Sequence, residues 1–226
     1  MGLAIKKSPM ENVTFDLLNM YAHGTAFQQY LTLPKKFFVD TLKWGIPHDA
    51  RVEMDQYDNP QAHYSLVLRE GEVIAGARTL PTTARWGDHS YMLRDACNGK
   101  LSAIPSGLIP EAMETDAVWE CTRLVVADSV TSMRDRIAVL GLIVDGLMDI
   151  AQPRGGETLM SLSNLWLHRA LRKLGHDCDL WCEPYVNADD GHKYAVMAMP
   201  INRAPTFVPN ATHLPQPGMV HAPSHV

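Results

Sequence analysis

Two strand-like segments joined by a two-residue turn constrain the fold more than any other part of the sequence. Residues 63–69 read HYSLVLR and residues 72–81 read EVIAGARTLP, with only Glu70 and Gly71 between them. Runs of β-branched and aromatic residues favour strands, and so short a connection ending in glycine joins two strands antiparallel. The chain is therefore expected to contain a β-hairpin, and with it an antiparallel region in its sheet.

The rest of the chain alternates helix-like and strand-like segments. Apolar residues recur at three- and four-residue steps in 133–151, which predicts an amphipathic helix: Met133, Ile137, Leu140, Val144, Leu147 and Ala151. Further helices are expected at 27–31, 35–45, 91–97 and 165–175, and further strands at 13–20, 117–128, 157–163, 177–183 and 193–201. Residues 51–58 are expected to form a loop that enters or contains a short strand. This order predicts an α/β sandwich with a mixed, mostly antiparallel sheet.

Several residues indicate where elements begin and end. Pro34 is expected to start the second helix or to kink a longer one, since proline suits the first turn of a helix and disrupts its interior. Ser90 is a candidate cap for the helix at 91–97. Gly175 is expected to end the helix at 165–175. Residues 1–201 are expected to form a single domain, and residues 202–226, rich in Pro and His, a flexible tail.

Composition excludes several classes of protein. The chain has 226 residues and a net charge of −5, which argues against general nucleic-acid binding. No apolar run is long enough for a membrane helix, and no apolar segment follows Lys6 and Lys7 as in a signal peptide. The four cysteines and the histidines fit no zinc template, and His168 and His176 are expected at the surface or at helix ends. We expect a cytoplasmic protein with reduced thiols, no metal, and neither nucleic-acid nor membrane partners.

Charged residues inside the strand-like segments point to one polar cluster. Asp55 and Asp58 lie three apart ahead of the hairpin, and Arg78 lies near the end of the second hairpin strand. Glu120 and Arg123 lie three apart in the strand at 117–128. Buried charges must pair with one another, and arginine can bridge two carboxylates in fixed geometry. These residues alone are compatible with a substrate site or with a salt-bridge network that only orders the fold.

The same motifs resemble the acyl-homoserine-lactone synthases, the LuxI-type autoinducer synthases of bacteria. The most specific are D-x-x-D at 55–58, R-x-L-P-T-T at 78–83 and E-x-x-R at 120–123. The fragments LKW (42–44), YMLRD (91–95) and RKLG (172–175) also match, in the family's order. The resemblance covers residues 13–201 and implies a three-layer sandwich with the N-acetyltransferase (GNAT)-like fold.

The resemblance also implies an activity. In the family, an acyl group arrives as a thioester on acyl carrier protein or coenzyme A, and the α-amine of S-adenosylmethionine attacks it. The amide then lactonises and expels methylthioadenosine, so S-adenosylmethionine is a substrate and no cofactor is needed. Glu120 matches the family's general base. Asp55, Asp58, Arg78 and Arg123 match its other charged positions.

Three further residues match family positions that bind substrate. Phe38 and Trp44 lie six apart, as the family's aromatic pair does, and aromatic faces can hold an adenine or a sulfonium cation. Thr122 matches a position near the acyl chain, where its hydroxyl could bond an oxygen on the third carbon. Each residue also has a plain structural interpretation: core packing for the aromatic pair, and an ordinary strand threonine for Thr122.

Two departures leave the substrate open. The family's arginine four residues before the phenylalanine is Pro34 here, and an aromatic after the Y-M-L-[KR]-D run is Cys97. Lys35 and Lys36 are the cationic residues nearest in sequence to Pro34, where the family has its arginine. Three interpretations therefore remain: an active synthase, a diverged N-acyltransferase that uses another amine, and a non-catalytic relative that binds a ligand or a carrier protein.

Overall fold

The structure is a computed structural model that describes residues 8–109, 113–202 and 211–213. Its strands are β1 (Met10–Asp16), β2 (His63–Arg69), β3 (Glu72–Pro81), β4 (Val118–Val126), β5 (Thr158–Asn164), β6 (Asp179–Leu180), β7 (Tyr185–Val186), β8 (Lys193–Pro200) and β9 (Ala211–His213). Its α-helices are α1 (Ala26–Pro34), α2 (Met92–Cys97), α3 (Met133–Ala151) and α4 (Leu165–Lys173). Short 3-10 helices span Met20–His23 and Gln152–Arg154, and a π-helix spans Lys35–Thr41.

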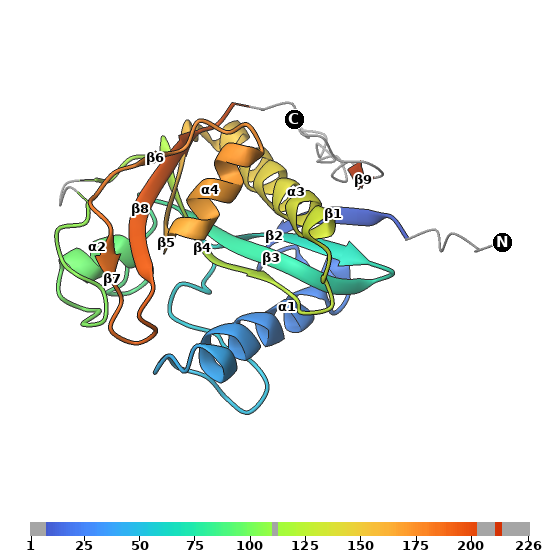
Figure 1. Cartoon of the computed structure of the whole chain (residues 1–226), viewed down its shortest axis with the longest axis horizontal. Coiled ribbons are helices and arrows are strands. Elements are labelled where there is room, and N and C mark those ends of the chain that lie inside the picture. The colour runs from blue at the N-terminus through green and yellow to red at the C-terminus, as the bar shows by residue number, and fades with distance from the viewer. Residues whose placement is uncertain (1–7, 110–112, 203–210, 214–226) are drawn as a thin grey trace, which may run out of the picture.

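The elements form three layers, as predicted. The sheet runs in the order β6-β8-β5-β4-β3-β2-β1-β9, with β7 paired to β8, and its pairs are antiparallel except β4–β5 and β1–β9. Figure 1 shows α3 and α4 over one face of the sheet and α1 across the other. The predicted hairpin is β2–β3, with Glu70 and Gly71 at positive φ in its turn. The sandwich with a mixed, mostly antiparallel sheet is confirmed.

Helix α3 lies close against the sheet because it carries a glycine where it crosses the first two strands. A β-carbon at Gly146 would lie 2.3 Å from Ser65 Oγ and 2.5 Å from Asn12 Oδ1. Those two polar side chains are themselves buried and satisfied. Asn12 Nδ2 donates to Ser65 Oγ at 3.0 Å, and Ser65 Oγ donates to the Ile143 carbonyl at 2.9 Å.

Strand β4 carries a bulge opposite β3, close to where it separates from β5. Arg78 of β3 pairs with Thr122 and Gly76 pairs with Val125, so two β4 residues, Arg123 and Leu124, face one residue of β3. Arg123 has a φ of 54°, in the left-handed region that non-glycine residues rarely adopt. The described β4–β5 ladder has only three registered pairs and ends at Glu120 with Met160. Beyond this point the two strands diverge.

The helix around Pro34 is continuous, so of the two expectations for Pro34 the longer helix holds and the start of a second helix does not; the irregularity after Pro34 is a π-helix. Pro34 is the last residue of α1, and the backbone passes directly into the π-helix at Lys35. A π-helix bonds each N–H one residue further back than an α-helix does, which accommodates a missing donor. The segment ends when Lys43 turns left-handed, with a φ of 61°.

Other sequence expectations need smaller corrections. Ser90 does not cap α2 with its side chain: Ser90 Oγ donates to the Ala84 carbonyl, and Tyr91 is the N-cap residue. The first strand is β1, which ends at Asp16, and the expected strand at 177–183 shrinks to β6. Residues 51–58 form a loop in which Glu53 makes a single bridge to His48.

His176 lies at the C-terminal end of α4, one of the two places expected, where its backbone N–H donates to the Leu171 carbonyl at 3.1 Å, but its side chain is buried. Its ring nitrogens have no hydrogen-bond partner among the described residues, and burial lowers its pKa. His168 instead contacts the carbonyl of Cys178 with its Nε2, at 3.0 Å. Gly175 ends the α4 turn with a φ of 88°, as expected.

Most of the expected flexible tail lies outside the described residues, and Ala211–His213 within it pairs in parallel with β1. In the described ranges, no helix has both the length and the apolar character to cross a membrane.

Candidate active site

Arg78 is the centre of the predicted polar cluster. Its side chain is fully buried, and its Nη1 lies 2.6 Å from Asp55 Oδ1 and 2.8 Å from Asp58 Oδ2. Its Nε donates to Thr122 Oγ1 at 3.1 Å, across the β3–β4 pair. Asp58 also accepts a hydrogen bond from the Tyr64 hydroxyl at 2.9 Å. The D-x-x-D motif and the hairpin arginine therefore meet as predicted.

The second arginine enters the cluster from the bulge in β4. Arg123 donates to Glu53 through two nitrogens, at 2.9 and 2.7 Å, and its Nη2 donates to Asp55 Oδ2 at 2.7 Å. Its guanidinium lies 5.3 Å from the centre of the Phe38 ring. Asp55 thus bridges the two arginines, and the left-handed backbone at Arg123 aims the side chain towards it.

Glu53 also belongs to this cluster and is only 1 % exposed, but it was not predicted from the sequence. The available signal was its position two residues before Asp55, which places both side chains on one side of an extended segment. With Glu53, three carboxylates face two arginines. The pKa of Asp55 reflects this: burial raises it, but the charges of Arg78 and Arg123 outweigh burial and lower it to about 2.

Glu120 lies beside this cluster with different partners. Its side chain is fully buried, and its two carboxylate oxygens accept hydrogen bonds from the backbone N–H groups of Met92 at 2.7 Å and Leu93 at 2.9 Å. These N–H groups belong to the first turn of α2, where helical N–H groups lack partners within the helix. Burial raises the pKa of Glu120 to about 7, against the opposing effect of the two N–H groups and of Arg78. The Arg123 side chain does not bond Glu120; it bonds Glu53 and Asp55.

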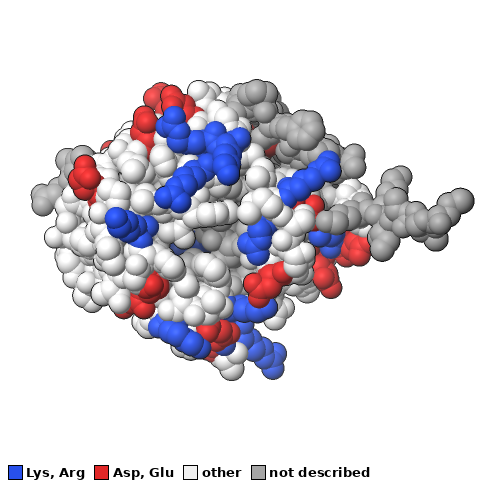
Figure 2. Space-filling view, viewed as in Figure 1, with Lys and Arg blue, Asp and Glu red and all other residues white. Residues whose placement is uncertain are grey.

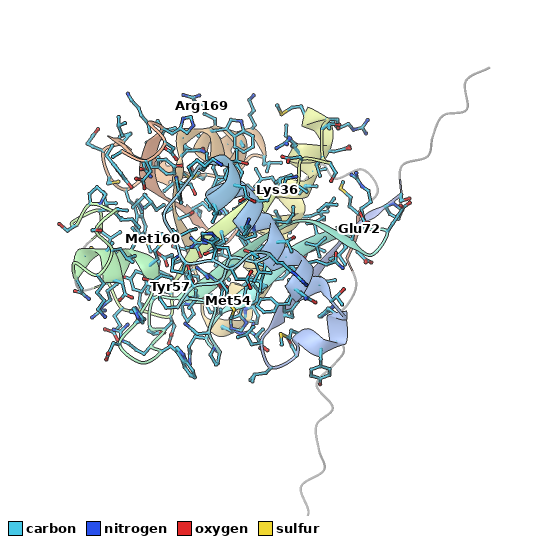
Figure 3. The ribbon with its side chains drawn as sticks, turned by 90° about the horizontal axis from the view of Figure 1, so that it is seen from below. Lys36, Met54, Tyr57, Glu72, Met160 and Arg169 are labelled. Atoms are coloured by element: carbon cyan, nitrogen blue, oxygen red, sulfur yellow. The ribbon has the colours of Figure 1, made fainter. Side chains whose placement is uncertain are left out.

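A pocket of about 600 Å³ opens where β4 and β5 diverge. Its walls include the divergent strand segments 122–126 and 161–164, the segment 100–104 after α2, and the hairpin around β7. Asp55, Thr122 and Arg123 reach it from the polar cluster, and Phe38 and Trp44 also line it, with the Phe38 ring beside Arg123. The Phe38 and Trp44 rings lie 4.9 Å apart at 32°. Figure 3 shows Tyr57, another wall residue, on the side of the sheet that α1 crosses.

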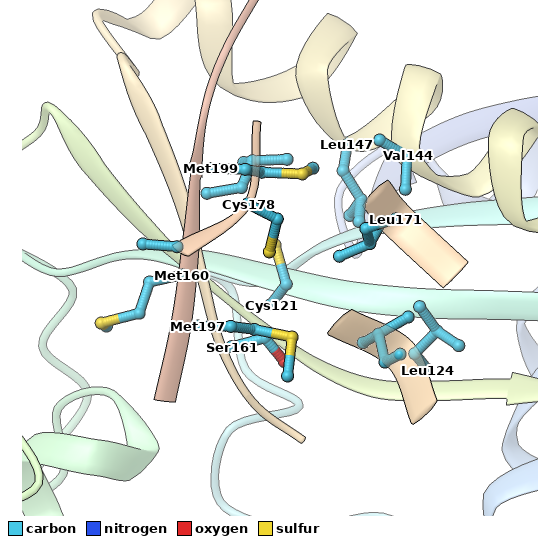
Figure 4. A pocket seen from close by; sticks show the side chains of 13 residues that line it. Cys121, Leu124, Val144, Leu147, Met160, Ser161, Leu171, Cys178, Met197 and Met199 are labelled. Atoms are coloured by element: carbon cyan, nitrogen blue, oxygen red, sulfur yellow. The ribbon is translucent and has the colours of Figure 1, made fainter. Parts of the chain in front are cut away.

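A smaller apolar cavity of about 40 Å³ adjoins this pocket. The two share Leu124, Ser161 and Leu167 in their walls. Figure 4 shows the thiols of Cys121 and Cys178 and the thioethers of Met197 and Met199 around the cavity. Flexible thioethers adapt to irregular apolar ligands. The pocket therefore has a charged end, an aromatic rim and an apolar end.

Of the two departures, Pro34 lies near the acidic cluster, because the Leu31 carbonyl of the same helix accepts the Glu53 N–H, and neither neighbouring lysine replaces the missing arginine. Lys35 pairs with Asp40 at 2.8 Å and Lys36 with Asp128 at 2.7 Å, so neither lysine contacts the acidic cluster. Lys36 lies well apart from Tyr57 and Met54 in Figure 3. Cys97 packs in a separate apolar cluster and contacts the Ile109 carbonyl. Neither Lys35 nor Lys36 thus substitutes for the family's arginine at Pro34.

The cysteines and potential metal ligands give no further site. All four cysteines are free thiols. In the part of the chain that the structure describes, no three His, Cys, Asp or Glu residues gather where they could hold a metal ion.

Comparison with known proteins decides the family. A family model described as autoinducer synthase matches residues 18–205. The chain belongs to this family. Among its relatives are the acyl-homoserine-lactone synthases of Vibrio anguillarum, 23 % identical over 83 % of this chain and 95 % of that protein, and of Acinetobacter nosocomialis, 26 % identical over 73 % and 86 %. The chain is therefore an enzyme of the acyltransferase class.

Solved structures support the fold. A CoA-dependent acyl-homoserine lactone synthase, BjaI, solved with MTA, superimposes with a TM-score of 0.68 at 15 % identity, covering 92 % of this chain and 95 % of that one. The synthase LasI gives 0.63 at 17 % identity, covering 86 % and 91 %. A putative N-acetyltransferase from Lactobacillus plantarum gives 0.50 at 15 % identity, covering 86 % and 99 %. The GNAT-like fold expected from the sequence is confirmed.

Proposed function

We propose that this enzyme joins an acyl group to the α-amine of S-adenosylmethionine and closes the product to an N-acyl-homoserine lactone, a quorum-sensing signal. The acyl donor is a thioester of acyl carrier protein or coenzyme A. The observation that carries the proposal is the pocket between the divergent strands, with an acid-rich charged end and an apolar end. Such a pocket fits one cationic and one aliphatic reactant at the same time.

The charged end suits the cationic substrate. Glu53, Asp55 and Asp58 exceed Arg78 and Arg123 by one charge, and an ionised Glu120 raises the excess to two. S-adenosylmethionine brings a sulfonium and an ammonium group, which this excess attracts. Phe38 and Trp44 supply aromatic faces for the adenine or the sulfonium.

Glu120 is the proposed general base. Attack on the thioester requires the ammonium to lose a proton, and a base with a pKa near 7 is suited to accept it at neutral pH. Because both oxygens already accept N–H groups and the side chain has no exposed surface, the proton reaches Glu120 through a bridging water or after a shift of α2. Asp55, with its low pKa, stays ionised and binds rather than takes protons.

The divergent strands receive the thioester. Their backbone N–H groups can donate to the oxygen of the tetrahedral intermediate, and the acyl chain extends into the apolar cavity. The C–N bond forms as the C–S bond breaks and the thiol leaves. The carboxylate of the methionyl moiety then attacks its γ-carbon, which breaks the carbon–sulfonium bond and releases methylthioadenosine. Thr122 Oγ1, which already accepts from Arg78, keeps its own proton to donate to an acyl oxygen.

Both donors carry phosphate, and basic side chains lie near the pocket. Lys100 and Arg136 form part of its wall. Figure 2 shows Lys and Arg side chains gathered over α4, where Arg169, Arg172 and Lys173 are exposed beside the pocket residues Trp166 and Leu167. A positive surface steers a phosphopantetheine arm towards the pocket whichever donor supplies it.

A second function is favoured by one observation, the loss of the arginine at Pro34 with neither Lys35 nor Lys36 in its place. A diverged N-acyltransferase would use the same acyl donor and another amine. A non-catalytic relative that only binds a ligand or carrier protein is the third alternative, and the burial of a carboxylate with a pKa near 7 beside the pocket speaks against it.

One experiment separates these functions. The pure enzyme is incubated with acyl-CoA or acyl carrier protein and with S-adenosylmethionine or other amines, and products are read by mass spectrometry. Release of methylthioadenosine with an acyl-homoserine lactone supports the synthase. An amide of another amine, without methylthioadenosine, supports the diverged transferase, and no product with any amine supports the binding protein.

A further inference from the structure

Asp190 joins two parts of the pocket rim that are far apart in the sequence. It lies in the connection between β7 and β8, and its Oδ2 accepts hydrogen bonds from the Trp44 Nε1–H at 3.1 Å and from the Tyr194 hydroxyl at 2.8 Å. Its Oδ1 accepts the backbone N–H of His192 at 2.9 Å. Trp44 and Tyr194 both line the pocket, and their ring centres lie 6.1 Å apart.

Trp44 is fixed at its backbone as well as at its indole. The left-handed Lys43 reverses the chain, and the Trp44 N–H donates to the Phe38 carbonyl at 2.9 Å. A non-glycine residue in this conformation costs free energy, so surrounding contacts must hold it. The indole nitrogen supplies one such contact, because its bond to the carboxylate ties the N-terminal rim to the β7–β8 hairpin.

We propose that Asp190 is a positioning residue that sets the orientation of Trp44 for the amine substrate. This rests on the proposed function, in which the Phe38–Trp44 pair faces the amine. Hydrogen bonds to an ionised acceptor are shorter and stronger than neutral ones, so a carboxylate holds the indole more firmly than a hydroxyl would. Tyr194 shares the same oxygen, which fixes the carboxylate in turn. By the same proposal the acyl chain lies in the apolar cavity, whose walls include neither Trp44 nor Tyr194.

The kinetic test compares Asp190→Ala with Asp190→Asn. Losing a charged acceptor is expected to raise KM for S-adenosylmethionine about 5- to 30-fold, with KM for the acyl donor changed less than about 2-fold. The asparagine variant keeps an oxygen for Trp44 and Tyr194 and should lose less. Glu183→Ala removes an exposed carboxylate from the neighbouring connection, between β6 and β7, and is the matched control, with no change expected. Equal effects on both substrates, or none, would overturn the proposal.

A second readout does not depend on turnover. The fluorescence of Trp44, taken as the difference between the wild type and Trp44→Phe, should shift to longer wavelength in Asp190→Ala and stay unchanged in Glu183→Ala. In the Trp44→Phe background, Asp190→Ala should add little further loss in S-adenosylmethionine binding, because the contact is already gone. Additive losses would show that Asp190 acts without Trp44. If the wild type makes no lactone but the shift occurs, the proposed function fails while the contact stands.

Discussion

The Glu120 carboxylate anchors the first turn of α2: its Oε1 accepts a 2.9 Å hydrogen bond from the backbone N–H of Leu93. The proposed base therefore has two tasks, because the charge that accepts a proton also satisfies the start of a helix. The segment that follows α2 forms one wall of the pocket. Protonation of Glu120 weakens the hydrogen bonds that it accepts from the Met92 and Leu93 N–H groups, so proton uptake and the position of this wall are linked.

Glu120→Gln is expected to abolish most amide formation. Loss of a general base typically costs about 10²- to 10⁴-fold in rate. The amide nitrogen would also face one of the two helix N–H groups, donor against donor, so we expect a lower melting temperature with the fold retained. Product formation by mass spectrometry and circular dichroism measure the two effects. Near-normal turnover at neutral pH would exclude Glu120 as the base.

The activity is expected to rise with pH up to about 7 and then level off. Burial raises the pKa of Glu120 from 4.5 to about 7, so the basic form accumulates through this range. The stability contribution has the opposite sign: the folded state binds more protons between pH 4.5 and 7, so this group destabilises the fold as pH rises through that window. The dependence of kcat/KM on pH checks the first trend, and chemical denaturation at several pH values checks the second. A rate independent of pH between 5.5 and 8, scanned in steps of about half a unit, would contradict the assignment.

Arg78→Ala and Asp58→Asn should lower stability and activity together. Arg78 has no exposed surface, and removing it leaves Asp55 and Asp58 buried without their main partner, a loss of about 3–5 kcal/mol in the free energy of unfolding. Denaturant titration measures this loss. If the fraction that stays folded keeps its full rate, the cluster only orders the fold and does not hold substrate.

Pro34→Arg restores the residue that the family places there. Pro34 is buried at the end of α1, and the neighbouring Leu31 carbonyl accepts the backbone N–H of Glu53, so an arginine side chain starts close to the acidic cluster. We expect S-adenosylmethionine binding to be strengthened or unchanged, with a modest change in stability. Calorimetry on the variant and the wild type is the measurement. No S-adenosylmethionine binding to the wild type, even with acyl donor present, would favour another amine.

Gly146→Ala should destabilise the protein, although alanine is the better helix former. A helix interior normally gains up to about 1 kcal/mol from this change. Here the new β-carbon would lie 2.3 Å from Ser65 Oγ and 2.5 Å from Asn12 Oδ1, two buried groups that cannot move without losing hydrogen bonds. Overpacking of this kind costs about 1–3 kcal/mol, measured by denaturation. A more stable variant would show that α3 can move away from the sheet.

Local patterns in the sequence determined much of the fold and the chemical inventory of the site. The hairpin and the long helix α3 follow from short-range rules on turns and apolar periodicity, which depend on neighbouring residues. The acidic pair, the two arginines and Glu120 were identified as one cluster because each falls inside a strand-like segment or just beside one. Ionised side chains in such places must find partners.

The tertiary structure decided how those residues are used. The left-handed Arg123, the divergence of β4 from β5 and the position of Glu53 depend on contacts between segments about 40 to 70 residues apart, which no local pattern encodes. The same holds for the bond between Trp44 and Asp190, 146 residues apart. Lys36 lies two residues after Pro34 in the sequence, yet its ammonium pairs with Asp128. Side-chain direction is set by which partner the fold brings within reach, and that is decided only when the chain has folded.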